Sequence, residues 1–426
     1  MRIVVVGAAG FIGRHILAEL VAAGHQITGA GRRPAQLRQA FPRVDFVACD
    51  LAHDVDPVAW RARFAGVDVV VNAAGLLRGR DMDAVHVTGP GALYKACIEA
   101  GVKRVVLVSA ISARADVDTD YARTKLAGER ALMTSGLDWT VLRPSLVYAK
   151  GSYGGTSLLR SLAGLPFFIP IPGEGSDTFS PIHADDLAHA IRLTCESDEL
   201  GACVLEPVGP ETLTLRDLLI RYRAWLGLGP ARFVTVPLWA MRLLAKLGDW
   251  LGTGPISTNS LAQLLAGNAG DGAAFAQAIG FTPRRLDTAL EAEPAEVQDR
   301  WHARLYFLAP VLKAALVLLW IALGVLGLVY GRRATETLVD RLALPASWVD
   351  PLKIGSSLLD FAMAGLLLAD RRGAMAMIAQ FVVVLGYTGL LGIALPALWL
   401  DPLGPLLKNL PILAAILVNG VLSDRR

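Results

Sequence analysis

The stretch "RIVVVGAAGFIGRHILAELVAAGH", residues 2–25, reads as a strand, a glycine-rich turn and a helix in direct succession. Its first part is short, β-branched and continuously apolar, which is typical of a strand buried in a parallel sheet. Gly7 permits a tight turn, Gly10 lets the backbone approach a pyrophosphate, and Gly13 lets the helix pack close to the strand. The free N–H groups at the start of the helix suit phosphates. The stretch therefore predicts a dinucleotide site.

Further short apolar strands follow, separated by segments with helical periodicity. We expect them within Gln26–Pro34, Val44–Leu51, Val67–Gly75, Arg104–Ala110 and Asp138–Pro144. Strands that alternate with helices predict an α/β fold, namely a Rossmann-like doubly wound parallel sheet.

The end of the second strand bears on the choice of cofactor. An acidic residue there would hold the ribose 2′-hydroxyl of NAD, but the chain has Ala30, Gly31, Arg32 and Arg33. Guanidinium groups pair well with phosphate oxygens, so these arginines favour the 2′-phosphate of NADP(H) over NAD(H). The other reading is two solvated arginines before a loop proline.

Composition divides the chain in two. Of its 426 residues, 54% are hydrophobic and 19% are charged, and the apolar excess lies beyond Trp301. We therefore expect a globular domain over residues 1–300 and a membrane domain over 305–426. The net charge is +3 without a basic block, which gives no indication of nucleic-acid binding. The four cysteines lack metal-ligand spacing, so no metal site is expected.

The segment "DYARTK" places Tyr121 and Lys125 one helical turn apart. Residues four apart share a helix face, so the ammonium group could lie near the phenol and lower its pKa. Such spacing also arises by chance, and the pair gains meaning only from its surroundings.

In these surroundings the chain resembles the extended and atypical short-chain dehydrogenase/reductase superfamily over roughly residues 1–295. The matching motifs are "GAAGFIG", "CDL", "NAAG", "YARTK", "LRPSLVY" and "FSPIHADDLAHAI". The resemblance implies that Tyr121 is the general acid or base, that Lys125 holds the nicotinamide ribose, and that Ser109 assists. It also implies a cofactor site made of Gly7, Gly10, Phe11, Ile12, Gly13, Arg32, Arg33, Asp50, Leu51, Ala73, Ala74, Gly75, Tyr121, Lys125 and Pro144.

Two positions depart from that family pattern. Ser109 is followed by Ala110 and Ile111 where a hydroxyl is usual, and His86 stands where the pattern has asparagine. His86 could relay protons or could be a buried, hydrogen-bonded histidine. The closest pattern is that of atypical members related to the nucleotide-binding accessory subunit of respiratory complex I, some of which bind NADPH without evident turnover.

Two regions follow the sheet and are expected to form the substrate region, about 150–180 and 205–300. The first is rich in glycine and proline, as in a substrate loop. Within the second, Val236–Gly252 has the pattern of an amphipathic helix, with Leu238, Trp239, Leu243, Leu247, Trp250 and Leu251 as its apolar band. This helix could lie at a bilayer surface or could pack on its own domain as a lid.

The C-terminal region has four apolar runs. They are Ala309–Gly331, Ile354–Ala369, Gly373–Leu400 and Pro402–Leu422. A span needs about 20 apolar residues, so the two shorter runs need neighbours and a four-helix bundle is expected. The segment "DPLGPLLKNLPILAAILVNG", residues 401–420, most visibly resembles the DoxX-like family of small four-helix membrane domains. Asp360 lies in the middle of the second run. It could have a functional role, it could be reached by water near one end of the helix, or it could pair with Lys353.

Orientation follows from the N-terminus, which lacks the features of a signal peptide. The expected location is a bacterial inner membrane, with the N-terminal domain and the C-terminus cytoplasmic. Arg371 and Arg372 in a short loop, and Arg425 and Arg426 at the tail, agree with the positive-inside rule, whereas the basic first loop does not.

Together these features predict a membrane-anchored NADP(H)-dependent oxidoreductase acting on a lipophilic carbonyl, alcohol or quinone. One alternative is a non-catalytic NADPH-binding module that stabilises or regulates a membrane complex. Another is an NAD(P)-dependent epimerase or dehydratase. The expected partners are a lipophilic small molecule, the lipid bilayer and, on the second reading, a membrane protein complex.

Overall fold

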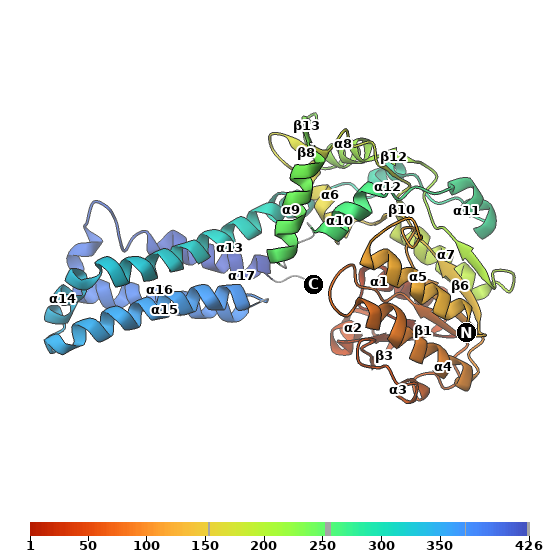
Figure 1. Ribbon diagram of the computed structural model, residues 1–426, viewed down its shortest axis with the longest axis horizontal. Coiled ribbons are helices and arrows are strands. Elements are labelled where there is room, and N and C mark those ends of the chain that lie inside the picture. The colour runs from red at the N-terminus through yellow and green to blue at the C-terminus, as the bar shows by residue number, and fades with distance from the viewer. Residues whose placement is uncertain (152–153, 252–256, 371, 424–426) are drawn as a thin grey trace. The chain divides into compact units, whose positions relative to one another are not determined.

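The computed structural model describes the chain except for residues 152–153, 252–256, 371 and 424–426 (Figure 1). Outside the described residues lie Gly252, Arg371, Arg425, Arg426 and the side chains of Trp250 and Leu251. The chain divides into two compact units, Met1–Ala303 and Arg304–Arg426.

A parallel sheet of seven strands forms the centre of the first unit (Figure 1). Its strands are β1 (Arg2–Val6), β2 (Gln26–Gly31), β3 (Asp45–Ala48), β4 (Val69–Asn72), β5 (Arg104–Val108), β6 (Asp138–Leu142) and β11 (Cys203–Leu205). They lie in the order β11-β6-β5-β4-β1-β2-β3, and every neighbouring pair is parallel. This confirms the doubly wound sheet.

Helices cover both faces of the sheet, because alternate residues of the buried strands point to opposite sides. On one face, Ile3 and Val5 pack with residues of α1 (Phe11–Ala22), α7 (Ala184–Glu196) and α11 (Gly272–Ile279). On the other, Val4 and Val6 pack with residues of α3 (Val58–Arg61), α4 (Gly89–Ala100) and α5 (Asp120–Met133). The short α2 (Pro34–Ala40) follows β2.

A second apolar core lies beside the sheet, built around buried residues such as Tyr148, Phe179 and Tyr222. Its strands form three two-stranded sheets: β7 (Val147–Tyr148) with β10 (Ile182–His183), β8 (Ile169–Pro172) with β13 (Phe233–Val236), and β9 (Thr178–Phe179) with β12 (Leu213–Thr214). The helices of this part are α6 (Gly155–Ala163), α8 (Leu215–Trp225), α9 (Leu238–Leu251), α10 (Thr258–Leu265) and α12 (Leu286–Ala292).

The second unit is helical. Its elements are α13 (Val297–Tyr330), which starts in the first unit, α14 (Arg332–Arg341), η2 (Ala346–Trp348), α15 (Val349–Ala369), α16 (Ala374–Ala394), η3 (Pro396–Trp399) and α17 (Asn409–Ser423). Among the described residues, three helices are long and apolar enough to cross a membrane, and α17 is a shorter apolar helix. One core joins residues of α13, α15, α16 and α17, such as Trp320, Met363, Val384 and Ile416. The second span is longer than the sequence suggested, because α15 begins at Val349.

Candidate functional site

The glycine-rich turn lies at the carboxyl ends of three strands. Gly7 has φ +82°, and a Cβ there would lie 2.7 Å from the backbone nitrogen of Ala74, so only glycine fits. The N–H of Gly7 donates to the carbonyl of Ala30 at the end of β2 (3.0 Å). A Cβ at Gly13 would lie 2.2 Å from the carbonyl oxygen of Gly7, so the helix packs on the turn as predicted. Gly10 is the N-cap of α1.

This turn marks the place where the strand order reverses, between β4 and β2 on either side of β1. Ligands of open α/β sheets bind outside the carboxyl ends of the strands at such a point. The start of α1 leaves backbone N–H groups without partners within the helix, which suits a diphosphate. Phe11 and Ile12 form the first turn of that helix. The backbone here therefore fits a dinucleotide.

Other residues of the expected cofactor site follow neighbouring strands. Arg32 and Arg33 come directly after β2, and both are exposed. Asp50 follows β3, where its carboxylate accepts the N–H of Ala52 (3.1 Å), and Leu51 beside it is buried. The sheet order therefore brings these side chains to one edge.

Three further residues of the expected cofactor site follow strands β4 and β6. Ala73 follows β4 and donates its N–H to the carbonyl of Val6 (2.9 Å). A Cβ at Gly75 would lie 3.1 Å from Nζ of Lys125, so this glycine gives the lysine room. Pro144 follows β6, and its carbonyl accepts the N–H of Ile111 (3.0 Å).

Lys125 extends from α5 to the ends of β4 and β5. Its ammonium group donates to the carbonyl of Val108 (3.1 Å) and to that of Ala74 (3.4 Å). The side chain is buried, and this burial lowers the pKa of Lys125 to about 8, while the charge of Glu129 acts in the opposite direction. Helix α5 starts at a capped position, since the Thr119 hydroxyl accepts the N–H of Ala122 (3.1 Å).

Tyr121 lies on the same face of α5, one turn before Lys125. Its ring is half-buried and meets the ring of His86 edge-on, with centroids 5.8 Å apart. Burial raises the pKa of Tyr121 to about 12. The expectation that Lys125 lowers this pKa is therefore wrong, because the ammonium group bonds to backbone carbonyls and desolvation of the phenol dominates.

His86, on the π-helix η1 (Ala84–Thr88), is a buried and fully bonded histidine. Its Nε2 accepts the N–H of Leu76 (3.0 Å), so the ring proton is on Nδ1 and is donated to the Thr124 hydroxyl (2.8 Å). That hydroxyl in turn donates to the carbonyl of Asp120 (2.8 Å). Burial lowers the pKa of His86 to about 3. This network favours the buried, hydrogen-bonded reading over a proton relay.

Ser109 is engaged by a buried ion pair that sequence reasoning missed. Its hydroxyl donates to the carboxylate of Glu129, which is fully buried. Arg143 donates to both oxygens of that carboxylate, through Nε at 3.0 and 3.1 Å and through Nη2 at 2.5 Å. The available signal was spacing, since Glu129 follows Lys125 by a further four residues on α5. Ser109 is thus tied to the pair that borders Lys125.

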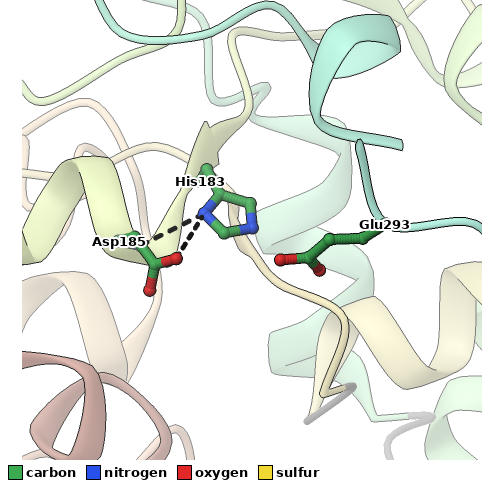
Figure 2. A group of neighbouring side chains, drawn as sticks. All are labelled: His183, Asp185 and Glu293. Atoms are coloured by element: carbon green, nitrogen blue, oxygen red, sulfur yellow. Dashed lines mark hydrogen bonds and ion pairs between the residues drawn. The ribbon is translucent and has the colours of Figure 1, made fainter. Parts of the chain in front are cut away.

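A separate cluster joins His183, Asp185 and Glu293, whose ligand atoms lie within 4.8 Å of one another (Figure 2). His183 caps α7, because its Nδ1 accepts the N–H of Asp185 (3.2 Å). The ring proton is therefore on Nε2, which faces Glu293 in Figure 2. A metal ion would need a lone pair that this tautomer lacks, so the geometry favours a helix cap over a metal centre.

Two family models match the chain. The NAD(P)H-binding model matches residues 7–161 and the DoxX-like model matches residues 317–417. One relative, a reductase of a Streptomyces species, is 30% identical to this chain, and the match covers 90% of that relative's length. The chain belongs to the NAD(P)-binding short-chain dehydrogenase/reductase superfamily and carries a DoxX-like membrane domain.

Several curated proteins are similar to the first unit. A ceramide reductase of Caulobacter vibrioides is 28% identical over 55% of this chain and 73% of its own. A 3-diazoavenalumate denitrifying reductase of a Streptomyces species is 30% identical over 61% of this chain and 90% of its own length. The alpha subcomplex subunit 9 of the Arabidopsis thaliana NADH dehydrogenase is 26% identical over 58% and 63%, which agrees with the predicted resemblance to complex I. The chain spans only 23% of an uncharacterised Mycobacterium tuberculosis protein that it also matches.

Among solved structures, MoeE5 in complex with UDP-glucose and NAD is similar with a TM-score of 0.53. It is 23% identical, and the match covers 71% of this chain and 99% of that one. At this identity the likeness shows the fold.

Proposed function

We propose that the protein is a membrane-anchored, NADP(H)-dependent reductase of a lipophilic carbonyl or quinone, or an oxidoreductase of the corresponding alcohol. The observation that carries this proposal is the placement of Tyr121 and Lys125 on one face of α5, at the strand ends that also hold the glycine-rich turn. This placement supports the proposal, because reduction of a carbonyl needs a proton donor beside the cofactor.

A bound nicotinamide supplies or accepts the hydride. Tyr121 then donates a proton to the oxygen of a carbonyl substrate as the general acid, since its phenol is protonated at neutral pH. The Lys125 ammonium is fixed near the ends of β4 and β5, where it would meet the nicotinamide ribose. Glu129 and Arg143 hold Ser109, so that hydroxyl would contact the substrate only through its oxygen.

Two features support the substrate class and the cofactor preference. The membrane unit puts the chain at a bilayer, where lipid-soluble substrates concentrate, and one relative is named for the reduction of ceramide, a lipid. The exposed Arg32 and Arg33 after β2 suit a 2′-phosphate. The substrate would be received by residues of about 150–180 and 205–300.

The test is NADPH consumption by the purified full-length protein in lipid nanodiscs, against a panel of quinones and of isoprenoid and steroid ketones. Consumption that depends on one substrate and is absent without it supports the proposal. Tight NADPH binding with no consumption across the panel would reject it.

A non-catalytic NADPH-binding module is the second candidate. It is favoured by the high pKa of Tyr121 together with the engagement of Ser109 by Glu129 and of His86 by Thr124, which leaves few groups free to move protons. Such a module would stabilise or regulate a membrane complex.

For the membrane unit we propose an inner-membrane location with the N-terminal unit and the C-terminus cytoplasmic. This requires α17 to complete a fourth crossing, although its 15 residues rise only about 22 Å. Cysteine accessibility at the first loop tests it: labelling at position 337 from the periplasmic side is expected, and labelling only from the cytoplasm contradicts it.

A further inference from the structure

Helix α9 exposes the apolar side chains that the sequence pattern assigned to its apolar band. Trp239 is 71% exposed, Leu243 54% and Leu247 48%, and the neighbouring Leu244 is also exposed. The helix is held to its unit by the buried Ala245 and lies against α10 (Figure 1). A lid packed on its own domain would bury this band, so the described side chains do not support that reading.

A second exposed apolar site flanks the same small sheet. Phe167 (78% exposed) and Phe168 (53%) directly precede β8, and α9 directly follows β13, which pairs with β8 in parallel. Four residues of strand span about 13 Å, so the two sites lie at opposite ends of a short ribbon. Single exposed apolar residues are common on protein surfaces, but exposed aromatic residues at both ends of one small sheet indicate an interaction surface.

The start of α13 lies beside the turn that carries Phe167, close to the place where the chain leaves the first unit. A Cβ at Gly164 would lie 2.9 Å from Cβ of the buried Ala303, so the turn before Phe167 packs on α13. Arg223 secures that turn by donating to the carbonyls of Ala163 (2.7 Å) and Leu165 (2.8 Å).

The apolar part of α13 follows at once. Residues 305–312 carry no charged side chain, and the apolar run expected from the sequence begins at Ala309, six residues after Ala303, a rise of about 9 Å. Trp301, which is 61% exposed, stands just before it, and tryptophan is enriched near the ends of membrane spans. Phe167 therefore lies on the part of the first unit from which the apolar helix leaves.

Charge is consistent with the same surface. Arg242 and Lys246 of α9 are exposed, whereas the carboxylate of Asp249 accepts the Thr258 hydroxyl (2.6 Å) and its N–H (3.2 Å). Basic side chains beside an apolar helix face suit the phosphates of an anionic leaflet.

We propose that α9 and the Phe167–Phe168 turn dock on the lipid–water interface of the membrane that the chain's own DoxX-like unit occupies. The occupant is the bilayer surface, because the same chain enters the bilayer a few residues beyond the contact with Gly164. This docking does not depend on catalysis.

The test uses the full-length protein in anionic lipid nanodiscs, with Cys203→Ser to leave only buried native cysteines. Leu243→Cys and, separately, Phe167→Cys are labelled with an environment-sensitive fluorophore. The matched control is Val58→Cys on α3, another exposed apolar helix residue of the same unit.

We expect blue-shifted emission at positions 243 and 167, and loss of most of that emission when lipids carry a nitroxide near the headgroup. Position 58 should show neither change. A blue shift without nitroxide quenching would mean that protein covers the helix, from the same chain or a second copy. That result, or emission at 243 and 167 that matches position 58, overturns the proposal. NADPH binding, measured in parallel, reports separately on the proposed function.

Discussion

The two units of the molecule bury polar groups in different ways. In the first unit, full charges are buried with partners: Glu129 with Arg143, and Lys125 with two backbone carbonyls. In the second, the buried amide of Gln380 accepts the indole N–H of Trp320 (2.8 Å), a neutral pair. The difference follows from the surroundings, because a charged side chain inside a bilayer has no water to solvate it and is costly unless it is well paired.

Two carboxylates of the second unit are buried as well, Asp360 on α15 and Asp370 directly after it, and Asp370 accepts the backbone N–H of Ala376 (3.0 Å). The Asp360 carboxylate accepts the phenolic hydroxyl of Tyr387 (3.3 Å), while Lys353 lies near Asp350 (3.8 Å). The pairing with Lys353 suggested by the sequence is therefore not found. A functional role for Asp360 stays a prediction, since ionisable residues within membrane helices commonly serve function.

The charged site of the first unit should respond most strongly to loss of its phenol. Tyr121→Phe is expected to lower turnover by about 10²–10⁴-fold, because general acid catalysis is lost, and to leave NADPH binding nearly intact. Steady-state kinetics and a binding titration measure the two effects. The matched control is Tyr94→Phe, at a buried tyrosine of α4, and this variant should keep its turnover. Full activity of Tyr121→Phe would remove this residue from the mechanism.

Breaking the buried ion pair should give the largest loss of stability. Glu129→Ala leaves the Arg143 guanidinium without its partner, and we expect a loss of about 3–5 kcal/mol in the free energy of unfolding of the first unit. Denaturant unfolding of the full chain in detergent measures it. Glu99→Ala breaks the exposed pair with Arg61 and should cost less than about 1 kcal/mol. Equal costs would mean that burial of the pair is unimportant.

Sequence reasoning predicted the glycine-rich turn well and the surroundings of Tyr121 less well. The turn is largely local, because Gly7 needs a positive φ (+82°) and Gly13 packs against the carbonyl oxygen of Gly7, six residues before it. The pKa of Tyr121 depends instead on how α5 packs against η1, and a residue pattern carries no measure of desolvation. The same holds for Glu129, since its partner Arg143 lies on another element and only the fold brings them together.

A smaller effect is expected at the exposed arginines Arg32 and Arg33, whose charges are not buried. Arg32→Ala is expected to weaken NADPH binding by about 1.5–3 kcal/mol, since one charge-assisted pair with the 2′-phosphate is lost, and to leave NADH binding unchanged. Titration with both cofactors decides between the 2′-phosphate and the solvated reading. Equal affinity of the unmodified protein for the two cofactors would contradict the preference.

The neutral pair of the membrane unit should show the smallest effect. Removing it in a double-mutant cycle of Gln380→Leu and Trp320→Phe is expected to give a coupling of about 0.6–1.7 kcal/mol, as is usual for hydrogen bonds between membrane helices. Unfolding of the full chain in mixed micelles measures it. A coupling as large as the Glu129 effect would erase the contrast between the units.

The most direct measurement of the central claim is the transfer of hydride itself. The full-length protein in nanodiscs is supplied with NADPH that is deuterated at the hydride-donating carbon, together with the lipid-soluble ketone that best supports consumption. The account predicts that mass spectrometry finds deuterium on the former carbonyl carbon of the alcohol, and that Tyr121→Phe abolishes most of this product. Bound NADPH with no deuterated product from any ketone or aldehyde, and no quinone-dependent consumption, would contradict it and favour the binding module.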